Sequence, residues 1–385
     1  MAEHVLQFFS TLNNGGAENR MMDVYRCVDP DVVMFDFAVV HEGEHFFDKE
    51  ILAGGSAKYV LPDPRTGLLK NYRAMVRFFR EHPFRAVHTH VSWYSGLVLM
   101  AAKQAGVKIR IAHARTAAIP NESLPKRMVR ILGQILIACS ATHRFAISEE
   151  AAQFIFGRWA VKQGRYQYIP NAIDQHKYAF LEGDQRTALR KQLGISEDKK
   201  AYVTVANFRK AKNHAFLLDV AKALKDRKDP FVLYLIGDGD LRSDIEKKIV
   251  DLELSEHVVL LGSRKDVPQI LTAFDAMIFP SIYEGLGGVV LEAQLTGVSA
   301  IVSDAIPTVA DLGIDMVDFL PLGDADRWAD AIIKKTQTPL RDHQMSLQAL
   351  EEKGYCIEQT TRKYLNAYGL TEDIISKALR RNTVN

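Results

Sequence analysis

The sequence has 385 residues, enough for two or three domains of ordinary size. Apolar residues make up 47% and charged residues 25%, as in soluble globular proteins, and a net charge of +2 gives no reason to expect a nucleic-acid binder. The three cysteines are widely spaced and match no metal site, so we expect reduced thiols in a cytoplasmic protein. We expect no signal peptide and no membrane span, because no run approaches the roughly 20 apolar residues that a span needs.

Strand-like and helical segments alternate along the first half of the chain. Strands are predicted at 5–10, 32–40, 57–61, 86–90, 109–113 and 145–148, and helices at 21–27, 68–81, 94–105 and 125–137. This alternation predicts a parallel sheet with helices on both faces. Ligands of such sheets bind where the strands end, and Gly15, Gly16, His90 and His113 fall at such positions.

The pattern breaks near 168–174, where Pro170 and Asn171 interrupt it, and 181–200 is polar and charged. A second series then begins. Its strands are predicted at 201–206, 232–236, 258–261, 273–280 and 299–303, and its helices at 215–225, 241–252, 267–273, 328–335 and over much of 342–368. We therefore expect two similar doubly wound domains with a cleft between them.

The stretch from 273 to 297 carries the most specific pattern. A buried strand is followed by a turn with Glu284 and the glycines Gly285, Gly287 and Gly288, and then by a helix with Glu292. The start of a helix after a glycine turn offers N–H groups to an anion. Two carboxylates suit sugar hydroxyls better than a phosphate. The stretch therefore predicts a nucleotide-sugar site.

Three further strand ends are candidates for the same site. The basic loop 207–214 concentrates positive charge at Arg209, Lys210 and Lys212, which would suit a diphosphate leaving group, although an ordinary solvated loop explains it equally well. The turns 237–239 and 262–264 also follow strands. A lone histidine such as His113 is more often structural than catalytic.

Residues 125–137 mix three basic side chains with apolar ones. A basic amphipathic helix can lie on an anionic membrane surface. A half-buried helix of the domain is the alternative.

Several motifs in a fixed order resemble one family. They are Asn14-Gly-Gly-Ala-Glu18, Ile111-Ala-His113, Asn171-Ala-Ile-Asp174, Lys212-Asn-His214, Ile236-Gly-Asp-Gly239, and the pair Glu284 and Glu292 after Pro280-Ser281. Together they resemble the retaining glycosyltransferases of the GT-B fold, family 4, and their branch that builds bacterial exopolysaccharide and capsule.

The resemblance implies an α/β GT-B fold with two Rossmann-like domains facing across a cleft. Residues 1–170 would form the acceptor-side domain, 171–358 the donor-binding domain, and a C-terminal helix within 359–385 would return to the first domain. The implied enzyme is a retaining, metal-independent hexosyltransferase without a cofactor. It would use a nucleotide-sugar, most simply a UDP-sugar, and a glycan or lipid-linked glycan acceptor. It would work in the cytoplasm, with residues 125–137 at the inner face of the plasma membrane.

The resemblance also assigns roles to residues. Gly16 would offer its main-chain N–H to the diphosphate, and Lys212 would neutralise it. Glu284 would hold the transferred sugar, Glu292 the ribose, and His113 would lie beside the sugar and leaving group. The remaining donor-site residues are Asn207, Arg209, Gly237, Arg264, Gly285, Leu286, Gly287 and Gly288, with the base read by main chain at Arg264.

The basic loop departs from the family pattern. Relatives often have Gly-Arg where this chain has Ala206-Asn207, and Arg209 comes two residues later. Either Arg209 reaches the phosphate from its shifted position, or Lys212 acts with less help.

Three alternatives remain at this point. A UDP-N-acetylglucosamine 2-epimerase would share the fold and donor. A two-lobed binding protein would share the architecture without catalysis. A nicotinamide oxidoreductase is disfavoured because the sequence lacks a dinucleotide fingerprint.

Overall fold

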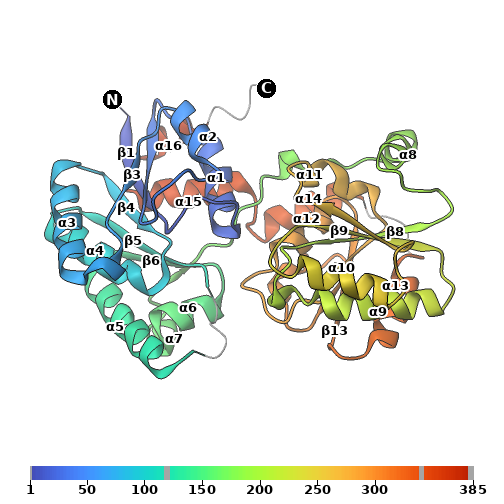
Figure 1. The fold of residues 1–385 in the computed structure, drawn as a ribbon. Helices are drawn as coiled ribbons and strands as arrows, with labels where there is room; N and C mark the ends of the chain where they lie inside the picture. Colours follow the sequence, from blue (N-terminus) through green and yellow to red (C-terminus); the bar gives the residue numbers. More distant parts are fainter. Residues whose placement is uncertain (1, 117–121, 338–341, 380–385) are drawn as a thin grey trace. The chain divides into compact units, whose positions relative to one another are not determined.

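The computed structural model describes residues 2–116, 122–337 and 342–379 (Figure 1). The chain divides into two compact units: unit 1 comprises Met1–Ile173 and Gly354–Asn385, and unit 2 comprises Asp174–Lys353. The boundaries between the two units fall at 173/174 and 353/354. The sequence predicted domain boundaries at 170/171 and 358/359.

Unit 1 contains a sheet of seven parallel strands. They are β1 (Glu3–Phe8), β2 (Val33–Val39), β3 (Lys58–Val60), β4 (Ala86–Thr89), β5 (Ile109–Ala114), β6 (His143–Ala146) and β7 (Gln167–Tyr168). Their order is β3-β2-β1-β4-β5-β6-β7. The direction of strand addition reverses between β1 and β4, which is the point where doubly wound sheets bind ligands.

Helices cover both faces of this sheet, because the strands are apolar on both sides. Val5 of β1 belongs to one core, together with α1 (Gly16–Arg26), α2 (Asp48–Ala53), α15 (Ile357–Ala367) and α16 (Glu372–Ala378). Leu6 and Phe8 belong to the opposite core, together with α3 (Leu68–Glu81), α4 (Ser95–Gln104), α5 (Leu124–Ser140), α6 (Glu149–Phe156) and α7 (Arg158–Lys162). The C-terminal helices therefore complete the first of these two cores, as Figure 1 shows in red.

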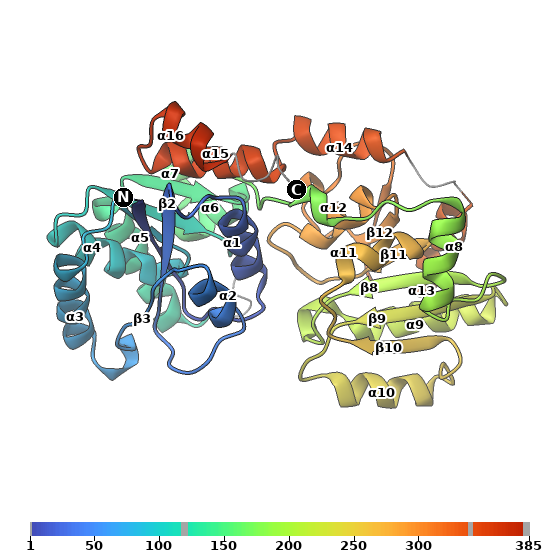
Figure 2. The same cartoon turned by 90° about the horizontal axis from the view of Figure 1, so that it is seen from above.

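Unit 2 repeats the architecture with six parallel strands. They are β8 (Lys200–Val205), β9 (Phe231–Ile236), β10 (Val258–Gly262), β11 (Ala276–Phe279), β12 (Ser299–Ser303) and β13 (Val317–Leu320), in the order β10-β9-β8-β11-β12-β13. α9 (His214–Asp226), α10 (Arg242–Asp251) and α13 (Ala325–Lys335) pack on one face. α12 (Gly288–Leu295) and α14 (His343–Glu352) lie over the other (Figure 2). The direction of strand addition reverses between β8 and β11.

The fold class predicted from the sequence is correct: both units are parallel α/β sheets of the Rossmann type. Several elements were not predicted from the sequence, and they include the short elements α2, α7 and β7 and the helix α16, as well as β13 and α8 (Gly183–Gln192). β13 lies in a segment given no structure, and α8 lies in the polar stretch 181–200. α8 has no apolar period because the residue it buries is Arg190, whose guanidinium donates to the Ala273 carbonyl at 2.8 Å. Among the described residues, no helix combines the length and apolar character needed to cross a bilayer.

Candidate functional site

Two loops meet at the reversal point of unit 2. The loop after β8 contains the short helix η4 (Lys210–Lys212), and the loop after β11 leads into α12. The N–H of Ile282 donates to the carbonyl of Ala211 at 2.8 Å, which ties the loops together. Their neighbouring strands bring the basic loop and the glutamate turn, both predicted site segments, to one place.

At this junction the Lys212 ammonium forms an ion pair with the Glu284 carboxylate. The Ser281 hydroxyl, which is fully buried, donates to Glu284 Oε1 at 2.9 Å. The hydroxyl of Ser303, at the end of β12, donates in turn to the Ser281 carbonyl. Lys212 Nζ also lies 5.2 Å from the centre of the Phe279 ring. Residues at the ends of three strands, β8, β11 and β12, thus hold the charged pair in place.

The glycine turn has a specific backbone requirement at Gly287. This residue precedes α12 with φ of 78°, in the left-handed region, and a Cβ there would lie 2.9 Å from Ile306 Cγ2. Leu286 is buried, whereas Gly285 and Gly288 are partly exposed. The first turn of α12 presents N–H groups that have no acceptor within the helix. Glu292, one turn further on, is partly exposed.

The turn at Gly237 packs against the backbone of the basic loop. Gly237 has φ of 147°, and a Cβ on it would lie 2.0 Å from the Ala206 carbonyl oxygen. The N–H of Phe208 donates to the Asp238 carbonyl at 2.9 Å. This close backbone packing leaves the side chains of Asn207 and Arg209 exposed.

Arg264 lies in the turn after β10 and pairs with Asp266. Its Nε donates to Asp266 Oδ1 at 2.8 Å, and its Nη2 contacts Oδ2. These hydrogen bonds lower the pKa of Asp266 and raise that of Arg264. The guanidinium therefore forms an ion pair within its own turn.

In unit 1, the predicted glycine pair lies at the start of α1, after β1. Gly16 is the first residue of the helix, is exposed, and has no atom within 4 Å of an added Cβ. Glu18, in the first helical turn, is half-buried; burial raises its pKa, against the lowering effect of the Arg115 charge. The N-terminus of α1 is therefore open to a ligand at Gly16.

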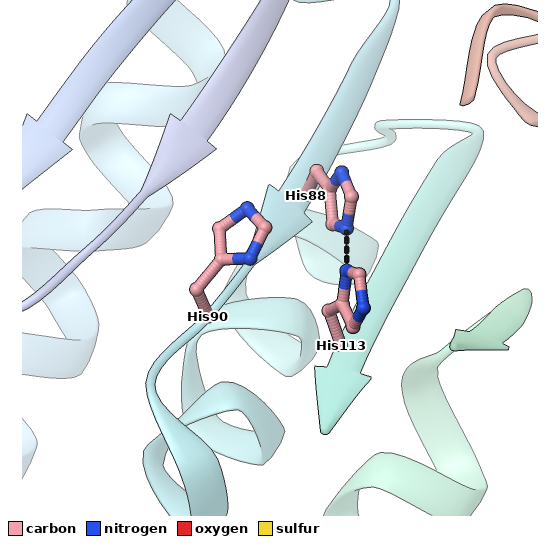
Figure 3. Close-up of side chains that lie close together, drawn as sticks. All are labelled: His88, His90 and His113. Carbon is pink, nitrogen blue, oxygen red and sulfur yellow. Dashed lines mark hydrogen bonds between the residues drawn. The ribbon is translucent and has the colours of Figure 1, made fainter. Parts of the chain in front are cut away.

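His113 lies at the end of β5 with 2% of its surface exposed. Figure 3 shows its ring beside those of His88 and His90, which come from the end of β4. His88 Nε2 lies 3.1 Å from His113 Nδ1, and the two rings are parallel. His113 Nε2 is buried with no hydrogen-bond partner among the described residues. Burial, and then the charge of Arg115, lowers the pKa of His113 well below its usual range, so the ring is neutral.

The three imidazoles are also the group of potential metal ligands found among the described residues, with ligand atoms within 4.8 Å of one another. Most of these nitrogens are already engaged. His88 and His113 share a hydrogen bond, and His90 contacts Gln7 Oε1 at 3.1 Å and Arg115 Nε at 3.0 Å. The nearby guanidinium is unfavourable for a cation.

Sequence reasoning placed His90 at a strand end but overlooked the partners of His113. Tyr368 contacts His88, and Tyr364 contacts both Arg115 and His113, although both tyrosines belong to the C-terminal segment. These contacts could not be inferred from the sequence, because the tyrosines are far from the histidines along the chain. The pattern His88-Thr-His90 does indicate that both histidine rings lie on one face of β4.

Comparison with known proteins agrees with these features. The family model for glycosyl transferases group 1 matches residues 185–352, and that for the glycosyl transferase 4-like domain matches 15–172. A protein of Bacillus subtilis (strain 168) named as a glycosyltransferase, EpsF, is 32% identical over 380 residues, covering 96% of this chain and 97% of its own. The chain belongs to family 4 of the GT-B glycosyltransferases.

Other family members are more distant. The UDP-Gal:alpha-D-GlcNAc-diphosphoundecaprenol alpha-1,3-galactosyltransferase of Escherichia coli is 27% identical over 70% of each chain. Among solved structures, Anabaena Alr3699/HepE in complex with UDP and glucose has a TM-score of 0.77 and 18% identity, over 95% of this chain and 99% of that chain. Membership in this glycosyltransferase family argues against the oxidoreductase and binding-protein alternatives.

Proposed function

We propose that this glycosyltransferase moves a sugar from a UDP-sugar to a glycan or lipid-linked glycan, with retention of configuration, in the synthesis of a bacterial surface polysaccharide. The observation that carries the proposal is the ion pair of Lys212 with Glu284 beside the start of α12. It offers positive charge for a diphosphate and a carboxylate for sugar hydroxyls at one point. The UDP complex of the Anabaena protein and the UDP-Gal donor of the E. coli relative support UDP as the nucleotide.

In unit 2, we assign Lys212 to the diphosphate and Glu284, with the turn Gly285–Gly288, to the transferred sugar. Glu292 would accept from the ribose hydroxyls, and the main chain around Arg264 would contact the base. Gly237 and Asn207 would shape the donor site. Arg209 is exposed and could reach a phosphate from its position before η4. In unit 1, we assign the Gly16 N–H to the diphosphate and His113 to a substrate oxygen.

We infer that transfer occurs with retention and without a covalent intermediate between the sugar and Glu284. Its carboxylate already accepts from Lys212 and Ser281, which suits binding of hydroxyl groups better than attack on the anomeric carbon. Leaving group and acceptor would then share one face of the sugar, and a diphosphate oxygen would take the acceptor proton. Lys212 and the N–H groups of α12 would stabilise the growing charge of the diphosphate in place of a metal ion or other cofactor.

We propose that α5 holds the enzyme at a membrane, close to a lipid-linked acceptor. The exposed apolar side chains of α5 are Leu124, Met128, Val129, Ile131, Leu132 and Ile135. Lys126 and Arg127 are exposed on the same helix, which has no acidic residue. An apolar stripe flanked by cations fits an anionic lipid surface, which would place the enzyme at the cytoplasmic face of the plasma membrane.

Release of free nucleotide from UDP-, GDP- and ADP-sugars, measured with and without EDTA, tests the proposal. UDP release should exceed the others, persist in EDTA, and fall by about 100-fold or more in Glu284→Ala. Glu351→Ala, at an exposed position of α14, is the matched control and should keep full activity. Conversion of UDP-N-acetylglucosamine to an epimer without acceptor, or full turnover by Glu284→Ala, would refute the assignment.

A further inference from the structure

A buried chain of hydrogen bonds in unit 1 has a fixed direction, and it begins at Arg115. The Arg115 Nε donates to His90 Nδ1 at 3.0 Å. A guanidinium has no acceptor, so His90 Nδ1 must carry the lone pair. The proton of the neutral His90 ring is therefore on Nε2, which donates to Gln7 Oε1 at 3.1 Å.

The direction continues through Gln7 and Tyr368. The Gln7 amide nitrogen donates to the Tyr368 hydroxyl at 3.1 Å, and the hydroxyl lies 2.8 Å from His88 Nδ1. The hydroxyl oxygen accepts from Gln7, and His88 Nδ1 is the acceptor that its single proton meets among the described residues. His88 Nδ1 is then an acceptor, and His88 carries its own proton on Nε2, which donates to His113 Nδ1 at 3.1 Å.

A shorter branch reaches the same atom. Arg115 Nη2 donates to the Tyr364 hydroxyl at 3.1 Å, and that hydroxyl lies 3.5 Å from His113 Nδ1. Both branches start at Arg115 and lead to His113 Nδ1, whose single lone pair accepts from His88 Nε2 at the shorter distance of 3.1 Å. The proton of His113 is thereby placed on Nε2, the buried atom that has no partner among the described residues.

We propose that this directed chain holds His113 as the Nε2–H tautomer, so that His113 donates a hydrogen bond to an oxygen of the bound substrate. Tyr368 and Arg115 are then positioning residues that act through His88, His90 and Tyr364. The inference rests on the proposed function and explains why the proton of His113 is on Nε2. A sugar hydroxyl or a phosphate oxygen supplies the acceptor that Nε2–H lacks among the described residues.

The electrostatics of the three histidines support this arrangement. Burial lowers the pKa of His88, His90 and His113 well below the usual range, and the Arg115 charge lowers each further. A protonated imidazole would have two donors and no acceptor, which would break the chain at that ring. The neutral rings keep the direction intact.

The tautomer can be measured without any assay of turnover. In the full chain labelled with ¹⁵N-histidine, two-bond ¹H–¹⁵N correlation spectra should show an unprotonated Nδ1 and a protonated Nε2 for His113. Tyr368→Phe removes the donor to His88 Nδ1, so His88 can hold its proton on either nitrogen and His113 should become a mixture of tautomers. Tyr355→Phe is the matched control: Tyr355 is equally buried in unit 1 and pairs with Tyr168 at 3.2 Å instead, so the His113 signals should not change.

Turnover provides the second readout. Tyr368→Phe should lower kcat several-fold with little change in KM for the donor, and His113→Ala should lower it further. The double variant should be no slower than His113→Ala alone, because both act through one atom. If no donor is turned over, the proposed function fails while the NMR result still decides the tautomer.

Three results would overturn the inference. One is a wild-type His113 protonated on Nδ1. Another is a His113 tautomer that is identical in wild type and Tyr368→Phe. The third is a stoichiometric shift of all three histidine rings on addition of Zn²⁺ to EDTA-treated protein, which would make the group a metal site.

Discussion

The Lys212 ammonium contacts the Glu284 carboxylate, although 72 positions separate the two residues in the sequence. Both side chains are largely shielded from solvent. Each holds the other in place, and the Ser281 hydroxyl is the second donor to Glu284 Oε1. A lysine ammonium has three donors, so Lys212 can keep its contact with Glu284 and still bind a phosphate oxygen. The pair thereby links the expected diphosphate and sugar positions.

Lys212→Ala should lower kcat by about 100-fold or more, because the leaving diphosphate loses its nearest positive charge and Glu284 loses its partner. Stopped assays of UDP release from the preferred donor would measure the effect. Lys210→Ala removes the same charge from the same loop, at an exposed position without a described side-chain contact, and should change kcat less than about threefold. Equal losses in the two variants would show that loop charge, rather than the Lys212 contact, is what matters.

Two glycines at strand ends allow a test of the support behind the basic loop. Gly237→Ala should destabilise the protein by about 2–4 kcal/mol and reduce turnover, because its Cβ would overlap the Ala206 carbonyl. Gly262→Ala is the control: Gly262 also has a positive φ, of 66°, but has no atom within 4 Å of an added Cβ. Its cost should be about 1 kcal/mol, from backbone conformation alone. Urea unfolding would compare them, and equal costs would contradict the role assigned to Gly237.

The sequence predicted those parts of the site that depend on strand ends. Lys212 follows β8 and Glu284 follows β11, and in a parallel sheet neighbouring strands end at the same edge, so their proximity could be inferred. The glycine requirement at Gly287 could be inferred for a similar reason, since a turn into a helix often needs a positive φ.

The parts that depend on contacts between remote helices could not be predicted. Tyr368 lies 280 positions from His88, and nothing in its local sequence distinguishes its buried hydroxyl from that of an ordinary core tyrosine. α8 was missed for a related reason: its buried face is Arg190, which is stabilised by carbonyls and by Asp275 rather than by apolar packing. Hydrophobic periodicity does not report such polar contacts.

His214 predicts a dependence of stability on pH. Burial, and then the charge of Lys212, lowers its pKa from 6.5 to about 4. Between these values the unfolded chain binds a proton that the folded protein excludes, so stability is lost as the pH falls below 6.5. His214→Leu removes this effect, and it also removes two ring nitrogens that have no partner among the described residues. The variant should therefore gain stability over wild type as the pH falls.

Urea unfolding at about pH 7.5 and about pH 5 would measure the change, and the gap between variant and wild type should widen by about 2 kcal/mol. Leu224→Ala is the control, because Leu224 is fully buried on the same helix, ten positions from His214, and does not titrate. Its effect should be the same at both pH values. A His214→Leu gap that does not depend on pH would show that His214 titrates alike in the folded and unfolded states.

The exposed face of α5 predicts binding to anionic lipid. Wild-type protein should float with vesicles that contain phosphatidylglycerol and not with phosphatidylcholine alone, and high salt should weaken binding. Replacing Met128, Leu132 and Ile135 with serine should weaken it by about tenfold or more, because their apolar surface can no longer be buried in the lipid interface. Val250→Ser on α10 changes a side chain of similar exposure, 66%, and should have no effect. Equal binding by the triple variant and wild type would refute the assignment of α5 as the membrane-binding face.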